Sequence, residues 1–131
     1  MNLYKLEEIF FTLVKDNISN EIKTKYSDLQ ISTDPQDIDE AKFPTIFIQM
    51  IDSSEVGRTL SAEEFSGVRA NYQIDVYSNK KISGKEVADE VMRIIKSLAF
   101  YIDVAPFTQF ANGVYRTTIR CNRVIGADDI L

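Results

Sequence analysis

The fold is decided by residues 68–98, which read VRANYQIDVYSNKKISGKEVADEVMRIIKSL. In residues 68–76 apolar and polar side chains alternate, and this period of two is typical of a half-buried β-strand with one polar face. The polar residues 78–81 break the strand. Apolar side chains then recur at helical spacing, at Val87, Val91, Ile94, Ile95 and Leu98. The stretch therefore predicts a strand followed by an amphipathic helix.

The start of this helix carries a capping signal. Ser83 and Glu86 have the spacing of a capping box, in which each of the two side chains accepts a hydrogen bond from the backbone amide of the other residue. We expect the helix to begin at this pair.

A second apolar run lies on the N-terminal side. Residues 43–51, FPTIFIQMI, are dense in β-branched and aromatic side chains and predict a central strand. Pro44 fits only the first residue of a strand or an edge. Residues 52–67 then turn polar and form a long excursion between two strands. Connections of this length tend to be functional or mobile.

The N-terminal part of the chain predicts an amphipathic helix. Residues 3–26 place apolar side chains at helical spacing, but the apolar stripe drifts after Asp16, which predicts a bend or an early end near Ser19. Leu29 and Ile31 alternate with polar residues and predict a short strand. Residues 33–42 are polar and rich in turn formers, so we expect a surface loop there.

The C-terminal part predicts a hairpin. Asn112-Gly113 is a strong hairpin signal because both positions tolerate a positive φ. It follows a short strand predicted at 107–110 and precedes a last strand at 114–125. On that last strand Tyr115, Thr117, Ile119 and Cys121 share one face, whereas Arg116, Thr118, Arg120 and Asn122 share the other.

Missing residue types exclude several kinds of chemistry. The chain has no histidine and one cysteine, Cys121, so Ser-His-Asp and Cys-His catalysis, an intramolecular disulfide and a cysteine-rich metal site are excluded within one chain. Cys121 lies in an alternating apolar stretch and is expected to be buried and inert. No glycine-rich phosphate loop occurs. We predict no catalytic residue, no cofactor and no metal ion.

The acidic segment 34–40 raises the question of calcium binding. It contains Asp34, Asp37, Asp39 and Glu40 but lacks the glycine and glutamate positions of an EF-hand loop. We interpret it as a solvated loop.

The charge of the chain bears on its partners. It holds 15 basic and 20 acidic residues, a net charge of −5, which disfavours non-specific binding of nucleic acid because such binding needs a basic excess. No apolar run approaches the roughly 20 residues that cross a bilayer. Acidic residues near the N-terminus also break any signal-peptide core. We therefore expect a soluble protein made in a reducing cytoplasm, with no membrane partner.

The charge is unevenly distributed along the chain. Residues 1–65 hold 13 acids and 6 bases, giving −7, whereas residues 66–131 hold 7 acids and 9 bases, giving +2. Arg116 and Arg120 on the last strand, beside a chain half rich in acids, suit head-to-tail contact between copies that closes into a ring. The alternative is that carboxylates of the same subunit, or water, satisfy these arginines.

The chain resembles the tail completion, or tail terminator, proteins of long-tailed bacteriophages. The matching stretches include FPTIFIQ (43–49), YQIDVYS (72–78), the helix from Ser83 to Leu98, and VYRTTIRCNRV (114–124). With the first helix they cover most of the chain. The resemblance implies one α+β domain, residues 1–131, in which a mixed or antiparallel sheet packs against two helices and a long hairpin or loop protrudes between the middle strands.

The same resemblance implies a function. Family members form a hexameric ring that caps the tail tube, ends its polymerisation and docks onto the head connector, so that DNA passes through without specific binding. We therefore expect a non-enzymatic virion protein of the tail or neck, assembled in the host cytoplasm, whose partners are itself, the tail tube protein and the head connector. Its expected interface residues are Arg58, Arg116 and Arg120.

Two alternatives stay open from the sequence. Another neck or head–tail joining protein of the same fold would carry the same pattern. A small cytosolic ligand-binding or enzymatic α+β domain would instead use acids and tyrosines such as Tyr72 and Tyr77.

Overall fold

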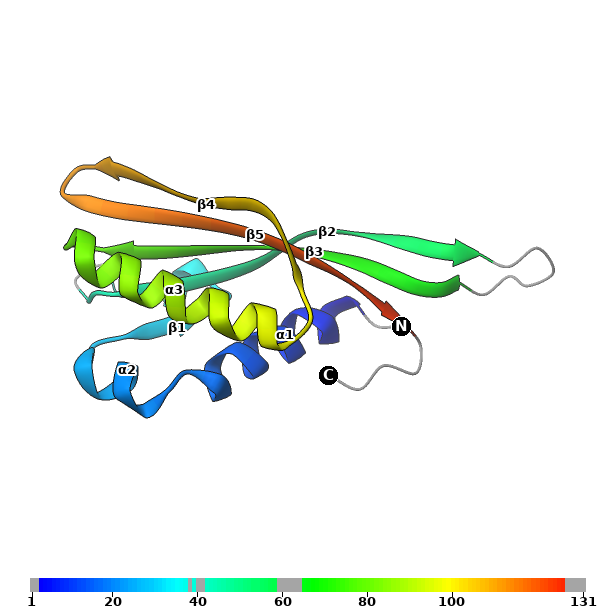
Figure 1. The fold of residues 1–131 in the computed structure, drawn as a ribbon, viewed down its shortest axis with the longest axis horizontal. Coiled ribbons are helices and arrows are strands. Elements are labelled where there is room, and N and C mark those ends of the chain that lie inside the picture. The colour runs from blue at the N-terminus through cyan, green and yellow to red at the C-terminus, as the bar shows by residue number, and fades with distance from the viewer. Residues whose placement is uncertain (1–2, 38, 40–41, 59–64, 127–131) are drawn as a thin grey trace.

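One five-stranded mixed sheet with helices on one face forms the protein (Figure 1). The computed structural model describes residues 3–37, 39, 42–58 and 65–126. In chain order the elements are α1 (Leu3–Asn17), α2 (Asn20–Lys25), β1 (Gln30–Ser32), a 3₁₀ turn (Pro35–Asp37), β2 (Thr45–Arg58), β3 (Phe65–Ser78), α3 (Lys81–Ser97), β4 (Tyr101–Ala111) and β5 (Val114–Gly126). The expected α+β class is confirmed.

The strand order is β1-β2-β3-β5-β4. β1 runs parallel to β2, and the β2–β3, β3–β5 and β4–β5 pairs are antiparallel. α3 connects β3 to β4, so these two parallel strands flank β5. β3 lies at the centre and is paired on both sides over nearly its whole length, from Gly67↔Gly126 to Ser78↔Tyr115 on one side and from Phe65↔Arg58 to Tyr77↔Thr45 on the other.

The helix-covered face of the sheet carries the core. On β3 and β5 the apolar set predicted from the alternation is buried, including Tyr72, Ile74, Ile119 and Cys121. Phe10 of α1 stacks on Tyr72 with 4.1 Å between ring centroids, and the Tyr72 hydroxyl donates to the carbonyl of Leu6 at 3.0 Å. The predicted helix stripe from Val87 to Ile95 is buried against the same face.

Two predicted breaks in the chain are confirmed. α1 ends at Asn17, and Ser19 begins α2 by accepting a hydrogen bond from the backbone N–H of Ile22. At the β4–β5 turn Asn112 and Gly113 have φ values of 53° and 78°, as a tight hairpin turn requires. The short strand predicted near Leu29 and Ile31 is β1.

The predicted capping box is wrong. α3 begins at Lys81 with Lys80 as its N-cap, so Ser83 lies inside the first turn. There the Ser83 hydroxyl donates to the Lys80 carbonyl at 3.0 Å, and the Glu86 carboxylate accepts from Lys25 and Tyr26. Contacts with β3 and α2 thus outweigh the local signal, which shows how tertiary structure sets a helix end.

The excursion predicted at 52–67 is largely strand. β2 continues to Arg58 and β3 starts at Phe65, in register down to Arg58↔Phe65, after one bulge between Met50 and Asp52. Residues 59–64 lie outside the described residues. We call residues 51–58 and 65–71 the arm; Figure 1 shows it extending beyond the helices. Of the two expected forms, hairpin or loop, the described part is a hairpin, because backbone pairing with β3 needs no apolar pattern.

β4 is also longer than its predicted 107–110. It spans Tyr101–Ala111, with register shifts between Ile102 and Val104 and between Val104 and Phe107. These irregularities break the alternation of apolar and polar residues, so the sequence pattern revealed only the part after Phe107.

Candidate interaction surface

The second face of the sheet carries no helix in the described part of the chain. Alternate positions of β3 and β5 point to it, and they are polar where the other face is apolar. The central group, which we call the polar network, consists of Gln73, Asp75, Arg116, Thr118 and Arg120. Several of these side chains are buried although no helix covers them, because the long arginine side chains lie across the strands.

Asp75 is the centre of the polar network. Its carboxylate is 1% exposed and accepts hydrogen bonds from the Arg116 Nε at 3.1 Å, the Arg116 Nη2 at 3.2 Å and the Thr118 hydroxyl at 2.7 Å. The Gln73 amide donates a further bond at 3.0 Å. A buried carboxylate with donors on all sides is stable without a partner molecule. The arrangement therefore holds β3 and β5 together through their side chains.

The network continues to Arg120 and is followed by a second group. The Arg120 Nε donates to the Gln73 side-chain oxygen at 3.1 Å. Further along the strands Arg69 donates to Asn122 at 3.1 Å, and Asn122 in turn donates to Asp103 of β4. Side-chain bonds thus tie β3, β5 and β4 together across this face.

The structure places the three predicted interface residues differently. Arg116 and Arg120 lie on the uncovered face, four residues apart on β5 with Thr118 between them. Arg116 is paired with Asp75 of the same subunit and remains 41% exposed, so the alternative of a same-subunit carboxylate holds for this arginine. Arg58 is the last residue of β2, and its side chain lies outside the described residues. Contact of these arginines with another copy stays a prediction.

Sequence reasoning missed Asp75. The residue was recognised only as one of the polar members of an alternating strand. Its role depends on the register Asp75↔Thr118 and Tyr77↔Arg116, and no local pattern encodes the register of two strands so far apart in sequence. The available signal was an acid on one strand and two arginines on another, both on the polar face.

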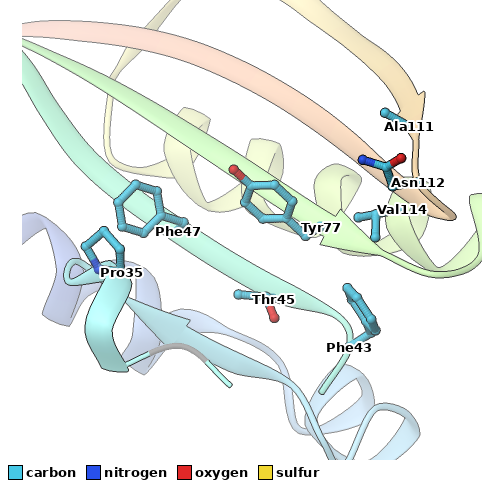
Figure 2. A pocket seen from close by; sticks show the side chains of 8 residues that line it. All are labelled: Pro35, Phe43, Thr45, Phe47, Tyr77, Ala111, Asn112 and Val114. Carbon is cyan, nitrogen blue, oxygen red and sulfur yellow. The ribbon is translucent and has the colours of Figure 1, made fainter. Parts of the chain in front are cut away.

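A hollow lies at one end of the uncovered face. It has a volume of about 580 Å³. Figure 2 shows Pro35 and Phe47 at one side of it, Asn112 and Val114 at the other, and Tyr77 between them. The remaining lining residues are Phe43, Thr45 and Ala111. The walls are mainly apolar, with the Tyr77, Thr45 and Asn112 side chains as polar groups.

Tyr77 joins the hollow to the polar network. Its ring lies 5.9 Å from the Arg116 guanidinium carbon, within range of a cation–π contact. Partial burial raises the pKa of the Tyr77 phenol; the nearby Asp75 charge raises it further, and the Arg116 charge opposes this. The phenol is therefore neutral at physiological pH and can donate or accept a hydrogen bond.

The other residues singled out by the sequence are structural. Tyr72 is buried in the core, where burial raises its pKa. Burial likewise raises the pKa of the Cys121 thiol to about 12, as expected for an inert cysteine. In the acidic segment, the Asp34 carboxylate accepts from the backbone N–H of Gln36 at 2.9 Å, while the Asp37 side chain and Glu40 lie outside the described residues.

The described residues lack two features that would point to particular functions. Among them no three acidic or cysteine side chains are grouped so that they would hold a metal ion. Within the same ranges no helix is long and apolar enough to span a membrane.

Both edges of the sheet expose backbone. β4 is paired only on its β5 side, and β1 covers β2 only from Thr45 to Phe47. In the described chain no strand pairs with the outer side of β2 from Ile48 to Arg58. Large apolar side chains are exposed along these edges: Ile51, Tyr101, Val104, Phe107 and Phe110.

Comparison with known proteins adds no relative. The sequence matches no protein-family model, and no curated protein is similar to it.

Proposed function

We propose that the chain is a structural protein of the tail terminator type. In this proposal it assembles into a homohexameric ring on the end of a bacteriophage tail tube, stops the polymerisation of the tube, and joins the tail to the head connector in the virion. It acts through shape and surface complementarity, and no residue carries out a chemical reaction.

The arm is the observation that carries the proposal. Two 14-residue strands pair down to Arg58↔Phe65 and extend beyond the helices. The inner part of the arm still covers the core through Val68 and Ala70 of β3, whereas the buried apolar residues among the described side chains of β2 lie at Ile46 and Ile48, before the arm begins. A projecting hairpin with a polar sequence suits contact with a neighbouring ring or tube.

The charge distribution supports the same assembly. The half of the chain with net charge −7 supplies β1 and β2, and the half with +2 supplies β4 and β5 at the other end of the strand order. On the strands themselves β2 has a net charge of −1, and β4 and β5 together have a net charge of +2 from Asp103, Arg116, Arg120 and Arg123, a difference in sign that suits head-to-tail contact. The overall negative charge also suits a conduit past which DNA slides, because acidic walls repel phosphate.

The first experiment is assembly with and without the tube. The purified chain would be examined by light scattering and negative-stain microscopy, alone and with the tail-tube protein encoded by the same genome. We expect rings, or conversion of monomers into rings on tube ends, and shorter tubes in its presence. A strict monomer at high concentration that ignores the tube protein would contradict the proposal. Binding to connector and not to tube would favour another neck protein.

The second experiment tests the arginine contacts. Charge reversal at Arg116 would also break its pair with Asp75, so Arg120→Glu is the cleaner variant: Arg120 is exposed and bonded to a neutral amide. We expect weaker ring assembly with only a small loss of stability, about 0.5–1 kcal/mol, from the hydrogen bond to Gln73 that is removed. Lys81→Glu, an exposed change of the same charge on α3, serves as the matched control. Equal assembly of all three proteins would remove Arg120 from the interface.

The hollow supports a second candidate, a ligand-binding domain. Its volume of about 580 Å³ lies in the range of small-molecule sites, and its lining is mostly apolar with a few polar groups. A ligand would raise the melting temperature of the wild-type chain but not that of a Val114→Phe variant, in which the added ring fills the hollow. The absence of any shift across a metabolite panel would leave the assembly proposal as the better one.

A further inference from the structure

The edge strand β4 has the properties of an interface. Natural edge strands are protected by charges, proline, β-bulges, short length or a covering element. β4 has 11 residues, and its only charged residue, Asp103, is already bonded by Asn122. Tyr101 is 70% exposed and Phe110 61% exposed. Pro106 and the register shifts before Phe107 protect the first part of the strand, whereas the regular part from Phe107 to Ala111 holds neither a proline nor a charge, so this part of the edge is open to pairing with another chain.

The outer edge of β2 has matching properties. Beyond β1, Met50 is capped by Glu7 of α1, whose carboxylate accepts from the Met50 backbone N–H at 3.1 Å. Residues 51–58 follow, and in the described chain no strand lies on the side of them that faces away from β3. Ile51, at the bulge, is 47% exposed. The arm therefore presents a free edge of the length that the regular part of β4 needs.

Strand direction favours a second copy of the same chain as the occupant. β3 and β4 run one way, and β2 and β5 run the other. If the next copy is placed head-to-tail along the sheet, its β2 lies antiparallel to β4, the stronger form of pairing. Because β1 blocks residues 45–47, the copies must be staggered along the strand direction. A stagger between neighbouring strands is also the geometry with which a sheet closes into a barrel.

Charge supports the same choice. Residues 51–58 carry Asp52 and Glu55 and end on Arg58. β5, the neighbour of β4, carries Arg116 and Arg120 on the uncovered face. Head-to-tail pairing brings the acidic part of the arm toward this basic strand. Pairing of β4 with another β4 would instead bring like charges together.

We propose that β4 of one subunit pairs antiparallel with residues 51–58 of β2 in the next copy, so that the arm of each subunit extends the sheet of its neighbour. The pairing rests on the proposed ring and names the surface that closes it. It also assigns the exposed side chains of β4 to the subunit interface.

Thiol crosslinking tests the pairing in the full-length chain. The double variant Ile51→Cys/Phe107→Cys would be treated with a short bismaleimide under ring-forming conditions and resolved on a denaturing gel. Cys121 needs no replacement, because it is completely buried. We expect a ladder of covalent oligomers, since each subunit offers one thiol at each edge. The matched control is Ile82→Cys/Phe107→Cys, because Ile82 is 80% exposed on α3, away from both edges.

The outcomes separate this inference from the function. A ladder from the double variant alone supports the pairing. Rings without a ladder overturn the pairing and leave the terminator function intact, and a covalent dimer from Phe107→Cys alone overturns it in favour of β4–β4 contact. A ladder from a protein that never caps tubes keeps the pairing and overturns the terminator function. A chain that never assembles overturns both.

A measurement on the unmodified protein guards against variants that fail to fold. Amide hydrogen exchange would be compared between monomer and ring. We expect exchange to slow by about tenfold or more in residues 101–111 and 51–58, and to stay unchanged in α3. Unchanged exchange at both edges in assembled rings would overturn the pairing.

Discussion

The buried side chains on the two faces of the sheet are stabilised by different interactions. On the helix-covered face, Phe10, Tyr72 and Phe100 pack ring against ring, with centroids 4.1–5.8 Å apart. On the uncovered face, Asp75 is as deeply buried but is held by directed hydrogen bonds. The helix-covered face is stabilised by the burial of apolar area, so it tolerates replacement of a side chain by another apolar side chain of similar shape. The second depends on each donor having its acceptor, so it fixes the register of β3 and β5.

The largest effect is expected on the covered face. Phe10→Ala removes a ring that is almost completely buried between Tyr72 and Phe100, and large-to-small changes of this kind cost about 3–5 kcal/mol. Denaturant unfolding would measure the loss. Ile82→Ala, at an exposed position of α3, is the control and should change stability by less than about 0.5 kcal/mol. A small effect of Phe10→Ala would mean that the core can collapse around the cavity.

A smaller loss is expected at the centre of the uncovered face. Asp75→Ala leaves Arg116 and the Thr118 hydroxyl without their acceptor; because Arg116 can turn to solvent, we expect a cost of about 2–3 kcal/mol. Unfolding curves would show it. In the wild-type chain, Arg116→Lys should retain only part of the interaction with Asp75, since an ammonium group does not reproduce the two guanidinium bonds. If the free energy of unfolding of Asp75→Ala equalled that of wild type, the network would not contribute to holding β3 and β5 together.

Part of the difference between the two faces could be predicted from the sequence, and part could not. The covered face followed from the alternation at 68–76 and the helical spacing at 87–98, because both are local periodicities. The Asp75 network and the true start of α3 at Lys81 were not predictable, and the arm was expected only as either a hairpin or a loop. Each depends on contacts between distant segments, such as Arg116 with Asp75 or Glu86 with Tyr26. The exposed edges likewise required the strand order.

The next prediction concerns the pH dependence of stability, to which Glu90 of α3 contributes. Burial alone would raise the pKa of Glu90, but hydrogen bonds from Arg93 and from the backbone N–H of Ser19 outweigh it and lower the pKa from 4.5 to about 2. A carboxyl whose pKa is lowered by folding stabilises the protein above its unfolded pKa. That contribution is lost as the pH falls from 4.5 through 2.

The size of this contribution is limited by solvent. Arg93 is 57% exposed, so screening reduces the contribution to about 1–2 kcal/mol. Unfolding free energies measured from neutral pH to pH 2 would show the loss, and Glu90→Gln should flatten that part of the curve. An equal slope in the variant would assign the acid sensitivity to other carboxyls.

The smallest effect is expected at the rim of the uncovered face. Arg120→Ala removes one hydrogen bond to the neutral Gln73 amide from an exposed position, which should cost about 0.5–1 kcal/mol. Thermal unfolding would measure it, with Gln73→Ala as the reciprocal variant. A double-mutant cycle would give the interaction between the two residues. A cost as large as that of Asp75→Ala would show that the network extends to its rim.

The continuity of β3 has a mechanical consequence. The strand that forms one side of the arm is the strand that carries Tyr72 and Asp75, and it is hydrogen-bonded on both sides with no bulge in its β5 pairing from Gly67 to Ser78. The arm is thus a continuation of the central strand of the sheet and is not joined to the body by an unpaired segment. Under a load directed along the strands, many hydrogen bonds must break together in shear before the arm can detach from the body.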